Sequence, residues 1–486
     1  MPLSGGKKPL AEEEMTMKKL LAVLLALTMV LTAAFAFAEG NPPGDPPSGT
    51  MGTPPDGNPP GDPPSGGMGG GFGGGTPPGG STSSFEYTAA AEITAAASVS
   101  GEAYATDTAD ESALIVNTDE AVTLDAVTVS KTGDSDGGDN CNFYGLNAAL
   151  LVMGGSTATI TNAAITSDAD GANGVFSYGG NGGQNGASGD GTTVIISDST
   201  ITTTGNGSGG IMTTGGGTTY AYNLTVETSG GSSAPIRTDR GGGTVVVDGG
   251  SYTANGLGSP AISSTADITV SNATLTSNLS EGVCIEGKNS ITLIDCDMTA
   301  NNTAMNGNAT FLDTIMIYQS MSGDADSGTS SFTMTGGSLT SKSGHMFHVT
   351  NTNAVISLSG VTLANEGSGV LLSVCDDGWS GASNIATLNA DGQALQGTIL
   401  VGDNSTLNLN LSNGSAFEGT VSGEITNAKG DTVSSEIGTV NVTLDETSTW
   451  TLTADTAITS FSGNAENVIS NGYTLYVDGA ALAGTR

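Results

Sequence analysis

Basic residues are scarce in this chain. Lys and Arg together number 11, against 48 Asp and Glu, in 486 residues, which gives a formal net charge of -37. Binding to nucleic acid or to an anionic membrane surface depends on a cationic patch that neutralises phosphates. Both are therefore excluded as partners, and the acidity suits a solvated extracellular surface.

Cysteines and helix-forming residues are also few. The four cysteines form no Cys-x-x-Cys pair, which leaves a zinc site without support, and their even number is only weak support for disulfides. Leu, Glu, Lys and Arg are sparse, whereas Thr, Ser, Asn and Val dominate and 75 residues are Gly. This composition favours strands and turns over helices.

The first 84 residues divide into two segments. Residues 1–38 have the pattern of a secretory signal peptide, with Lys18-Lys19, an apolar run over 20–30 and an Ala-x-Ala site at 36–38. An uncleaved anchor helix is the alternative interpretation, and no membrane span is expected after cleavage. Residues 39–84 repeat Pro-Pro-Gly and then become Gly-rich, which predicts a disordered linker that cannot pack a core.

A periodic body follows over residues 85–486. One short pattern recurs along it: an apolar residue, a polar residue, a corner residue and then a second apolar residue. Val270-Ser271-Asn272, followed by Leu275, is an example. Successive copies lie 23–26 positions apart, with longer steps of 36 and 41 where loops are inserted. The corner residues, where a left-handed conformation is expected, are Ala126, Asn162, Asp198, Asn223, Gly249, Asn272, Asp295, Gly336 and Gly360.

A period near 24 built from short strands leaves few architectures. Leucine-rich repeats need a Leu pattern that is absent, and propeller blades need about 40 residues each. An all-β parallel β-helix fits, because each strand can pair with its equivalent one coil away at about 4.8 Å. The inward residues of the second strand should then stack: Ile165, Ile201, Val226, Tyr252, Leu275, Met298, Leu339 and Leu363.

This pattern resembles the right-handed parallel β-helix superfamily, which includes pectate-lyase-like enzymes and bacterial adhesin-like secreted proteins. From about residue 385 the coils, such as 406–415 and 442–452, resemble those of adhesins, and 471–477 resembles their closing strand. The resemblance implies a secreted or extracellular cell-surface, adhesin-like protein that binds an extracellular polysaccharide or a host or cell-wall glycan. It also leaves open a polysaccharide lyase or glycoside hydrolase, and a structural stalk without a ligand.

A further strand of each coil can be aligned after the corner, and it carries the candidate ligand-binding residues. One isoleucine in each of these strands is expected to point inward: Ile236, Ile262, Ile285 and Ile317. Because side chains alternate along a strand, the residues that follow them should form one outward column: Arg237, Ser263, Glu286 and Tyr318. Planar donors, carboxylates and aromatic rings suit sugar hydroxyls and sugar faces. The same groups suit a lyase or hydrolase, and a surface ion pair between Arg237 and Glu286 is the structural alternative. The candidate set is Arg237, Asp239, Arg240, Glu286, Lys288, Tyr318, His348, Asp376 and Trp379.

An acidic loop gives a weaker signal. Asp134, Asp136 and Asp139 lie close together in sequence, and carboxylate oxygens are the ligands that Ca²⁺ prefers. The loop lacks the terminal Glu of an EF-hand, so a solvated loop is the competing interpretation. The sequence therefore predicts Ca²⁺ as the possible cofactor and fixes no catalytic residue.

Overall fold

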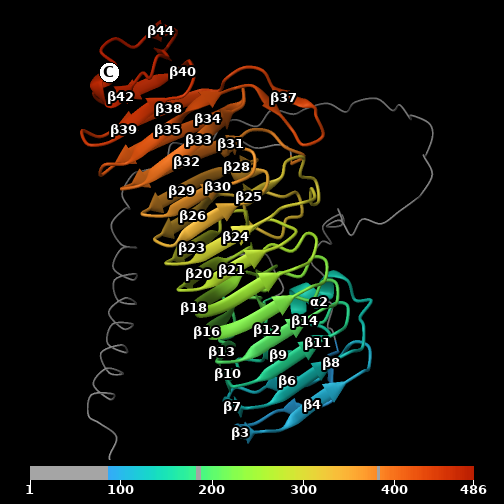
Figure 1. Ribbon diagram of the computed structural model, residues 1–486. Coiled ribbons are helices and arrows are strands. Elements are labelled where there is room, and N and C mark those ends of the chain that lie inside the picture. The colour runs from blue at the N-terminus through green and yellow to red at the C-terminus, as the bar shows by residue number, and fades with distance from the viewer. Residues whose placement is uncertain (1–85, 182–187, 380–383) are drawn as a thin grey trace, which may run out of the picture. The chain divides into compact units, whose positions relative to one another are not determined.

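The computed structural model describes residues 86–181, 188–379 and 384–486, and within them the chain winds into stacked coils of short parallel strands (Figure 1). The expected signal peptide (1–38) and linker (39–84) lie outside the described residues. In the described part, no helix is long and apolar enough to cross a membrane. The fold is a parallel β-helix, as the repeat predicted.

The first strand of each coil pairs with its equivalents in neighbouring coils to form the first ladder. It consists of β3 (Ala97–Ser100), β7 (Ala121–Asp125), β10 (Thr157–Thr161), β13 (Thr193–Ser197), β16 (Gly217–Thr228), β18 (Gly243–Ala254), β20 (Asp267–Ser271), β23 (Ser290–Ile294), β26 (Thr329–Thr335), β29 (Asn353–Ser359), β32 (Asn384–Asp391), β34 (Ser405–Ser412), β38 (Thr439–Leu444) and β41 (Ser460–Ser462).

The second ladder follows the corner. Strands β16 and β18 run through the corner and join the first two ladders into one 22-stranded sheet. The other members are β4 (Ala103–Thr106), β8 (Thr128–Lys131), β11 (Ala164–Ser167), β14 (Thr200–Thr203), β21 (Thr274–Ser277), β24 (Asp297–Ala300), β27 (Ser338–Ser341) and β30 (Thr362–Asn365).

The third ladder is a separate 15-stranded parallel sheet. Its strands are β2 (Glu92–Ile93), β6 (Leu114–Asn117), β9 (Leu150–Met153), β12 (Val175–Tyr178), β15 (Ile211–Thr214), β17 (Ile236–Thr238), β19 (Ile262–Ser264), β22 (Val283–Glu286), β25 (Asp313–Tyr318), β28 (His345–Thr350), β31 (Val370–Val374), β33 (Ala394–Val401), β35 (Ala416–Ser422), β39 (Thr449–Leu452) and β42 (Val468–Ile469).

Smaller elements lie outside these ladders. They are β1 (Thr88–Ala89), β5 (Glu111–Ser112), α2 (Asp139–Tyr144), β36 (Ile425–Thr426), β37 (Thr432–Ser434), β40 (Thr456–Ile458), the 3₁₀-helix η1 (Ala465–Asn467), β43 (Leu475–Val477) and β44 (Ala480–Ala481). The expected closing strand contains β43, which pairs with β40 and β44 in a three-stranded sheet near the C-terminus.

The predicted stacking of the first two ladders is confirmed. Val270 pairs with Val247 on one side and Leu293 on the other, and Leu275 pairs with Tyr252 and Met298. All six side chains are fully buried. Each large apolar side chain removed from water contributes about 1.5–3 kcal/mol, so the repeated inward column is the main stabilising element of the stack.

The corner residues adopt the expected left-handed conformation. The φ angles are positive at all nine predicted positions, including 54° at Asn272 and 51° at Ala126. The amides also link coils: Asn272 Nδ2 donates to Asp248 Oδ1 at 2.7 Å, and Asn162 Nδ2 donates to Asp125 Oδ1 at 3.0 Å. Asn and Asp tolerate this backbone region better than other non-glycine residues, which explains why they recur there.

Candidate functional site

The third ladder carries four of the nine predicted ligand-binding residues, in a different register from the predicted one: Arg237, Glu286, Tyr318 and His348. Ser263 pairs with Arg237 and with Cys284, whereas Glu286 pairs with Tyr318 two positions further along the strand. The predicted single column of Arg237, Ser263, Glu286 and Tyr318 is therefore wrong. Because inward Val283 and Ile285 are both apolar, residue type alone does not choose between the two alignments.

The correct register defines two outward columns on this face. In the first, paired residues on successive strands are Met212, Arg237, Ser263, Cys284, Met316, His348 and Ser373. In the second, Glu286 pairs with Tyr318, which pairs with Thr350. His348 thus belongs to the column of Arg237, although three coils separate the two residues.

The three predicted cations on and beside this face each have an acidic partner within the chain. Arg237 Nη2 lies 2.8 Å from Asp239 Oδ2, Arg240 pairs with Asp324, and Lys288 Nζ lies 2.9 Å from Asp326 Oδ2. Arg240 also lies over the ring of Phe143, 4.0 Å from its centroid.

Arg237 and Asp239 are almost fully buried. Burial raises the pKa of Asp239, and the charge of Arg237 partly opposes that rise. Arg237 therefore holds its strand end to the neighbouring carboxylate, and the predicted surface pair with Glu286 is replaced by this buried one.

Glu286 lies under the insertion that contains Asp324 and Asp326. Its carboxylate accepts hydrogen bonds from Ser320, from Ser322 at 3.1 Å and from the Tyr318 hydroxyl at 3.3 Å. Burial raises its pKa to about 7, and nearby acidic charges add to the rise. A carboxyl group that titrates near neutrality is suited to general acid–base chemistry, but burial in a structural contact produces the same shift.

A small pocket opens beside these residues. Its volume is about 30 Å³, and its lining includes Arg237, Glu281, Cys284, Tyr318 and Trp379. The rings of Tyr318 and Trp379 lie 4.9 Å apart between centroids, and the buried indole Nε1 has no hydrogen-bond partner among the described residues. This volume accommodates about one water molecule, so a sugar ring can contact the aromatic pair at the mouth but cannot enter.

Two histidines and a serine form a buried hydrogen-bonded cluster further along this face. Ser373 Oγ lies 2.8 Å from His345 Nδ1 and 2.7 Å from His348 Nδ1, and His348 Nε2 lies 3.2 Å from Asp377 Oδ2. If Nε2–H of His348 donates to Asp377, its Nδ1 accepts from Ser373, which in turn accepts from His345. Burial lowers the pKa of His345 to about 3, which keeps that ring neutral.

The cluster has the residue types of a nucleophile, a base and a carboxylate, but it is closed. Ser373 and His348 are fully buried, and the Phe311 ring covers both histidines at centroid distances of 5.3 and 4.8 Å. Thr310, next to Phe311, donates to Asp377. The cluster therefore ties the loop around Asp377 to the third ladder, and its hydroxyl is not accessible to a substrate.

Sequence reasoning missed several buried polar residues here. Glu281 and Asp313 are each 1% exposed, and burial raises the pKa of both carboxyl groups. Cys284 and Ser373 occupy the Arg237 column. A polar residue at an outward strand position normally indicates exposure, so the only available signal was the length of the loops that cover this face.

Two remaining predictions concern the loops. Asp376 accepts a hydrogen bond from Asn384, so it too has an internal partner. In the predicted calcium loop, Asp134 accepts from the Asp170 amide at 2.8 Å and Asp139 begins α2. Across 86–181, 188–379 and 384–486, no three His, Cys, Asp or Glu side chains are grouped to hold a metal, so calcium binding stays a prediction.

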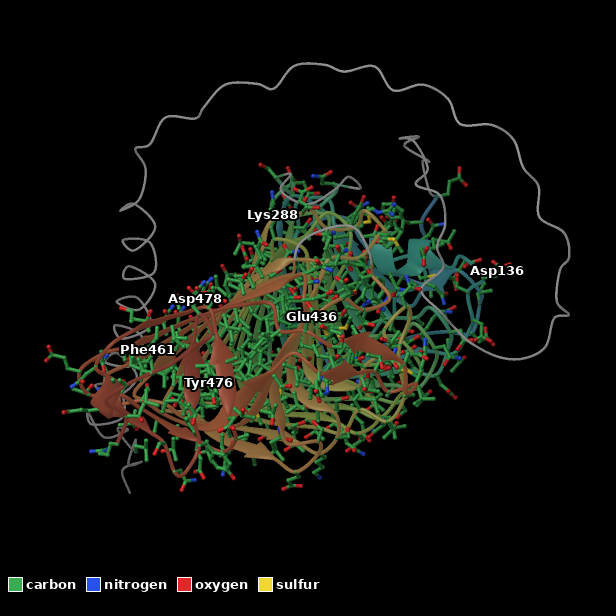
Figure 2. All side chains as sticks on the ribbon, turned by 90° about the horizontal axis from the view of Figure 1, so that it is seen from above. Asp136, Lys288, Glu436, Phe461, Tyr476 and Asp478 are labelled. Carbon is green, nitrogen blue, oxygen red and sulfur yellow. The ribbon has the colours of Figure 1, made fainter. Side chains whose placement is uncertain are left out.

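The view along the stack places Asp136 and Lys288 at separate points on its periphery (Figure 2). Helix α2, which begins at Asp139 of the acidic loop, nevertheless reaches the third-ladder side, because its Phe143 ring lies under Arg240. All four cysteines are free, so the described coils are held together without disulfides. No protein-family model, no curated protein and no solved structure matches this chain.

Proposed function

We propose that this chain is a secreted or cell-surface, adhesin-like protein that binds an extracellular glycan through the outer face of its β-helix. The observation that carries the proposal is the Tyr318–Trp379 pair at the mouth of the third-ladder pocket. Aromatic faces pack against the apolar faces of sugar rings, which is the contact that these two rings can offer. The net charge of -37 favours a ligand that is not a polyanion.

Binding fits this geometry better than cleavage. Glycoside hydrolysis requires a sugar held between two carboxyl groups, and the pocket of about 30 Å³ cannot enclose a ring. Glu286 favours a lyase or hydrolase as the second candidate. Its carboxyl group is hydrogen-bonded to Tyr318 and has a pKa of about 7, which suits proton transfer near neutral pH.

The test is a glycan array followed by titration of the bound glycans into the full chain and into Trp379→Ala. Removal of the indole face is expected to weaken binding at least tenfold. Tyr473→Ala is the matched control, because it removes another exposed ring, 42% exposed, near the C-terminus. Equal affinities of Trp379→Ala and the unaltered chain would refute this site, and release of new reducing or unsaturated ends would favour the enzyme.

A further inference from the structure

A second hollow lies at the corner between the third and first ladders, away from the Trp379 pocket. Its volume is about 370 Å³, against about 30 Å³ for that pocket. Sites for small ligands usually measure about 300–1,000 Å³. The lining is polar and backbone-rich, and it includes Gly241, Gly242, Thr244, Asp267, Lys288 and Asn289.

Close contact between stacked turns explains why side chains are missing from this corner. Gly241 and Gly242 have φ angles of 84° and 62°, which favour glycine. A Cβ at Gly241 would lie 2.5 Å from the Asn181 carbonyl oxygen and 2.7 Å from Gly215 Cα. The two turns can therefore approach this closely only with glycine at position 241.

Two tyrosines lie on the outer face of the first ladder next to this hollow. Tyr220 and Tyr222 alternate with buried residues on β16, so their rings share the outward side, and Tyr222 is 38% exposed. Ile195 and Val246, from the coils before and after, pair with Tyr220 and are only partly buried. Together these four residues are called the tyrosine platform below.

The register connects the hollow to the tyrosine platform. Thr244 lines the hollow, pairs with Thr218, and lies two residues before Val246 on β18. Since a strand advances about 3.3 Å per residue, the outward positions after Thr244 follow at about 7 Å intervals. One continuous surface therefore runs from the hollow onto the rings.

The chemistry of this surface selects an uncharged ligand. Strands β13, β16 and β18 contain no Lys or Arg, and Asp248 lies beside the platform. Lys288, in the hollow, is paired with Asp326. A polyanion would find no free cation among these residues, whereas sugar hydroxyls would find Thr, Asp and Asn side chains, and sugar faces would find two rings.

We propose that the hollow and the tyrosine platform form a second glycan site, which takes a neutral polysaccharide with one sugar unit in the hollow and the next units along Tyr220 and Tyr222. The inference shares the ligand class of the proposed function but places the contact on another face. It does not depend on the Trp379 pocket.

The experiment compares binding of soluble β-glucan, xylan and mannan, with polygalacturonate as the acidic counterpart, by affinity electrophoresis and calorimetry on the full chain. Tyr220→Ala/Tyr222→Ala is expected to weaken binding of at least one neutral polymer tenfold or more. Tyr220→Phe/Tyr222→Phe keeps the rings and should retain most of the affinity. Thr244→Trp, at an exposed position, should block the hollow and weaken binding without loss of folding.

The outcomes separate the two sites. Loss of binding in the tyrosine variants but not in Trp379→Ala supports the platform and removes the third-ladder site, and the reverse result overturns the platform. Absence of binding to every neutral polymer, or binding only to polygalacturonate, also overturns it. A concentration-dependent dimer that the tyrosine substitutions abolish would instead identify the platform as a contact between copies of the chain.

Discussion

Replacing Glu286 by Gln should stabilise the protein at high pH and leave it unchanged at low pH. In the folded state burial raises the pKa of this carboxyl group from 4.5 to about 7. The folded protein therefore holds a proton on Glu286 between these values, whereas the unfolded chain has released it. Stability is lost as the pH rises through this window, since the folded state is then the one that binds more protons.

The size of the effect follows from the shift. About 2.5 pKa units at 1.36 kcal/mol each give an upper limit of about 3 kcal/mol, because Glu286 retains some exposure to solvent. A Gln side chain has nearly the same shape and does not titrate. Ser320 and Ser322, which donate to the carboxylate, can rotate their hydroxyls to accept from the new amide.

The assay is chemical denaturation at pH 4, 6 and 8 for the unaltered chain, Glu286→Gln and the control Glu366→Gln, whose side chain is exposed. The stability difference between Glu286→Gln and the unaltered chain should grow with pH by about 2–3 kcal/mol, while the control should track the unaltered chain. A difference that is constant from pH 4 to pH 8 would show that the pKa of Glu286 is the same in the folded and unfolded states, and would refute the reasoning.

Three further outcomes follow from single side chains. Leu275→Ala should lower the free energy of unfolding in urea by about 2–5 kcal/mol, because it opens a cavity in a fully buried column. Asn272→Val should cost about 1–2 kcal/mol in the same assay, and Asn272→Gly should be nearly neutral, because φ is 54° at this corner. His345, whose folded pKa is about 3 against an ordinary 6.5, should make stability fall as the pH drops from 6.5 toward 3, and His345→Asn should reduce that slope in acid unfolding curves.

The first two ladders were predictable because two independent signals agree in each coil. Each coil has an inward apolar residue, such as Val270, and a corner residue at a fixed separation from it, such as Asn272. A wrong register would therefore move the apolar residue out of the core and the corner residue out of the corner. The observed pairing of Val270 with Leu293 and the positive φ at Asn272 confirm this reasoning. Burial and backbone conformation thus constrain the same alignment.

The third ladder has that second signal only in part. Left-handed residues lie four positions before some of its strands, as Ser232 and Gly258 do before β17 and β19. No residue from 278 to 282 has a positive φ before β22, where Val283 and Ile285 are both inward candidates. The observed pairing of Ile262 with Val283 shifts Glu286 two positions from Arg237. Loop partners were not predictable either, since Asp324 reaches Arg240 across 84 residues of sequence.

The insertions decide which outward positions of the β-helix stay uncovered. On the third ladder, loop residues such as Phe311, Ser320 and Asp326 cover outward positions that a bare coil would expose, and buried His348 is the consequence. A buried polar side chain must find hydrogen-bond partners within the protein. The charged and polar residues that suggest a site from the sequence are therefore already hydrogen-bonded or ion-paired within the chain. Residues without such cover, such as Tyr222, keep their outward faces available. Binding assays should therefore compare variants of the uncovered first ladder with variants of the third-ladder pocket, where the proposed function places its site.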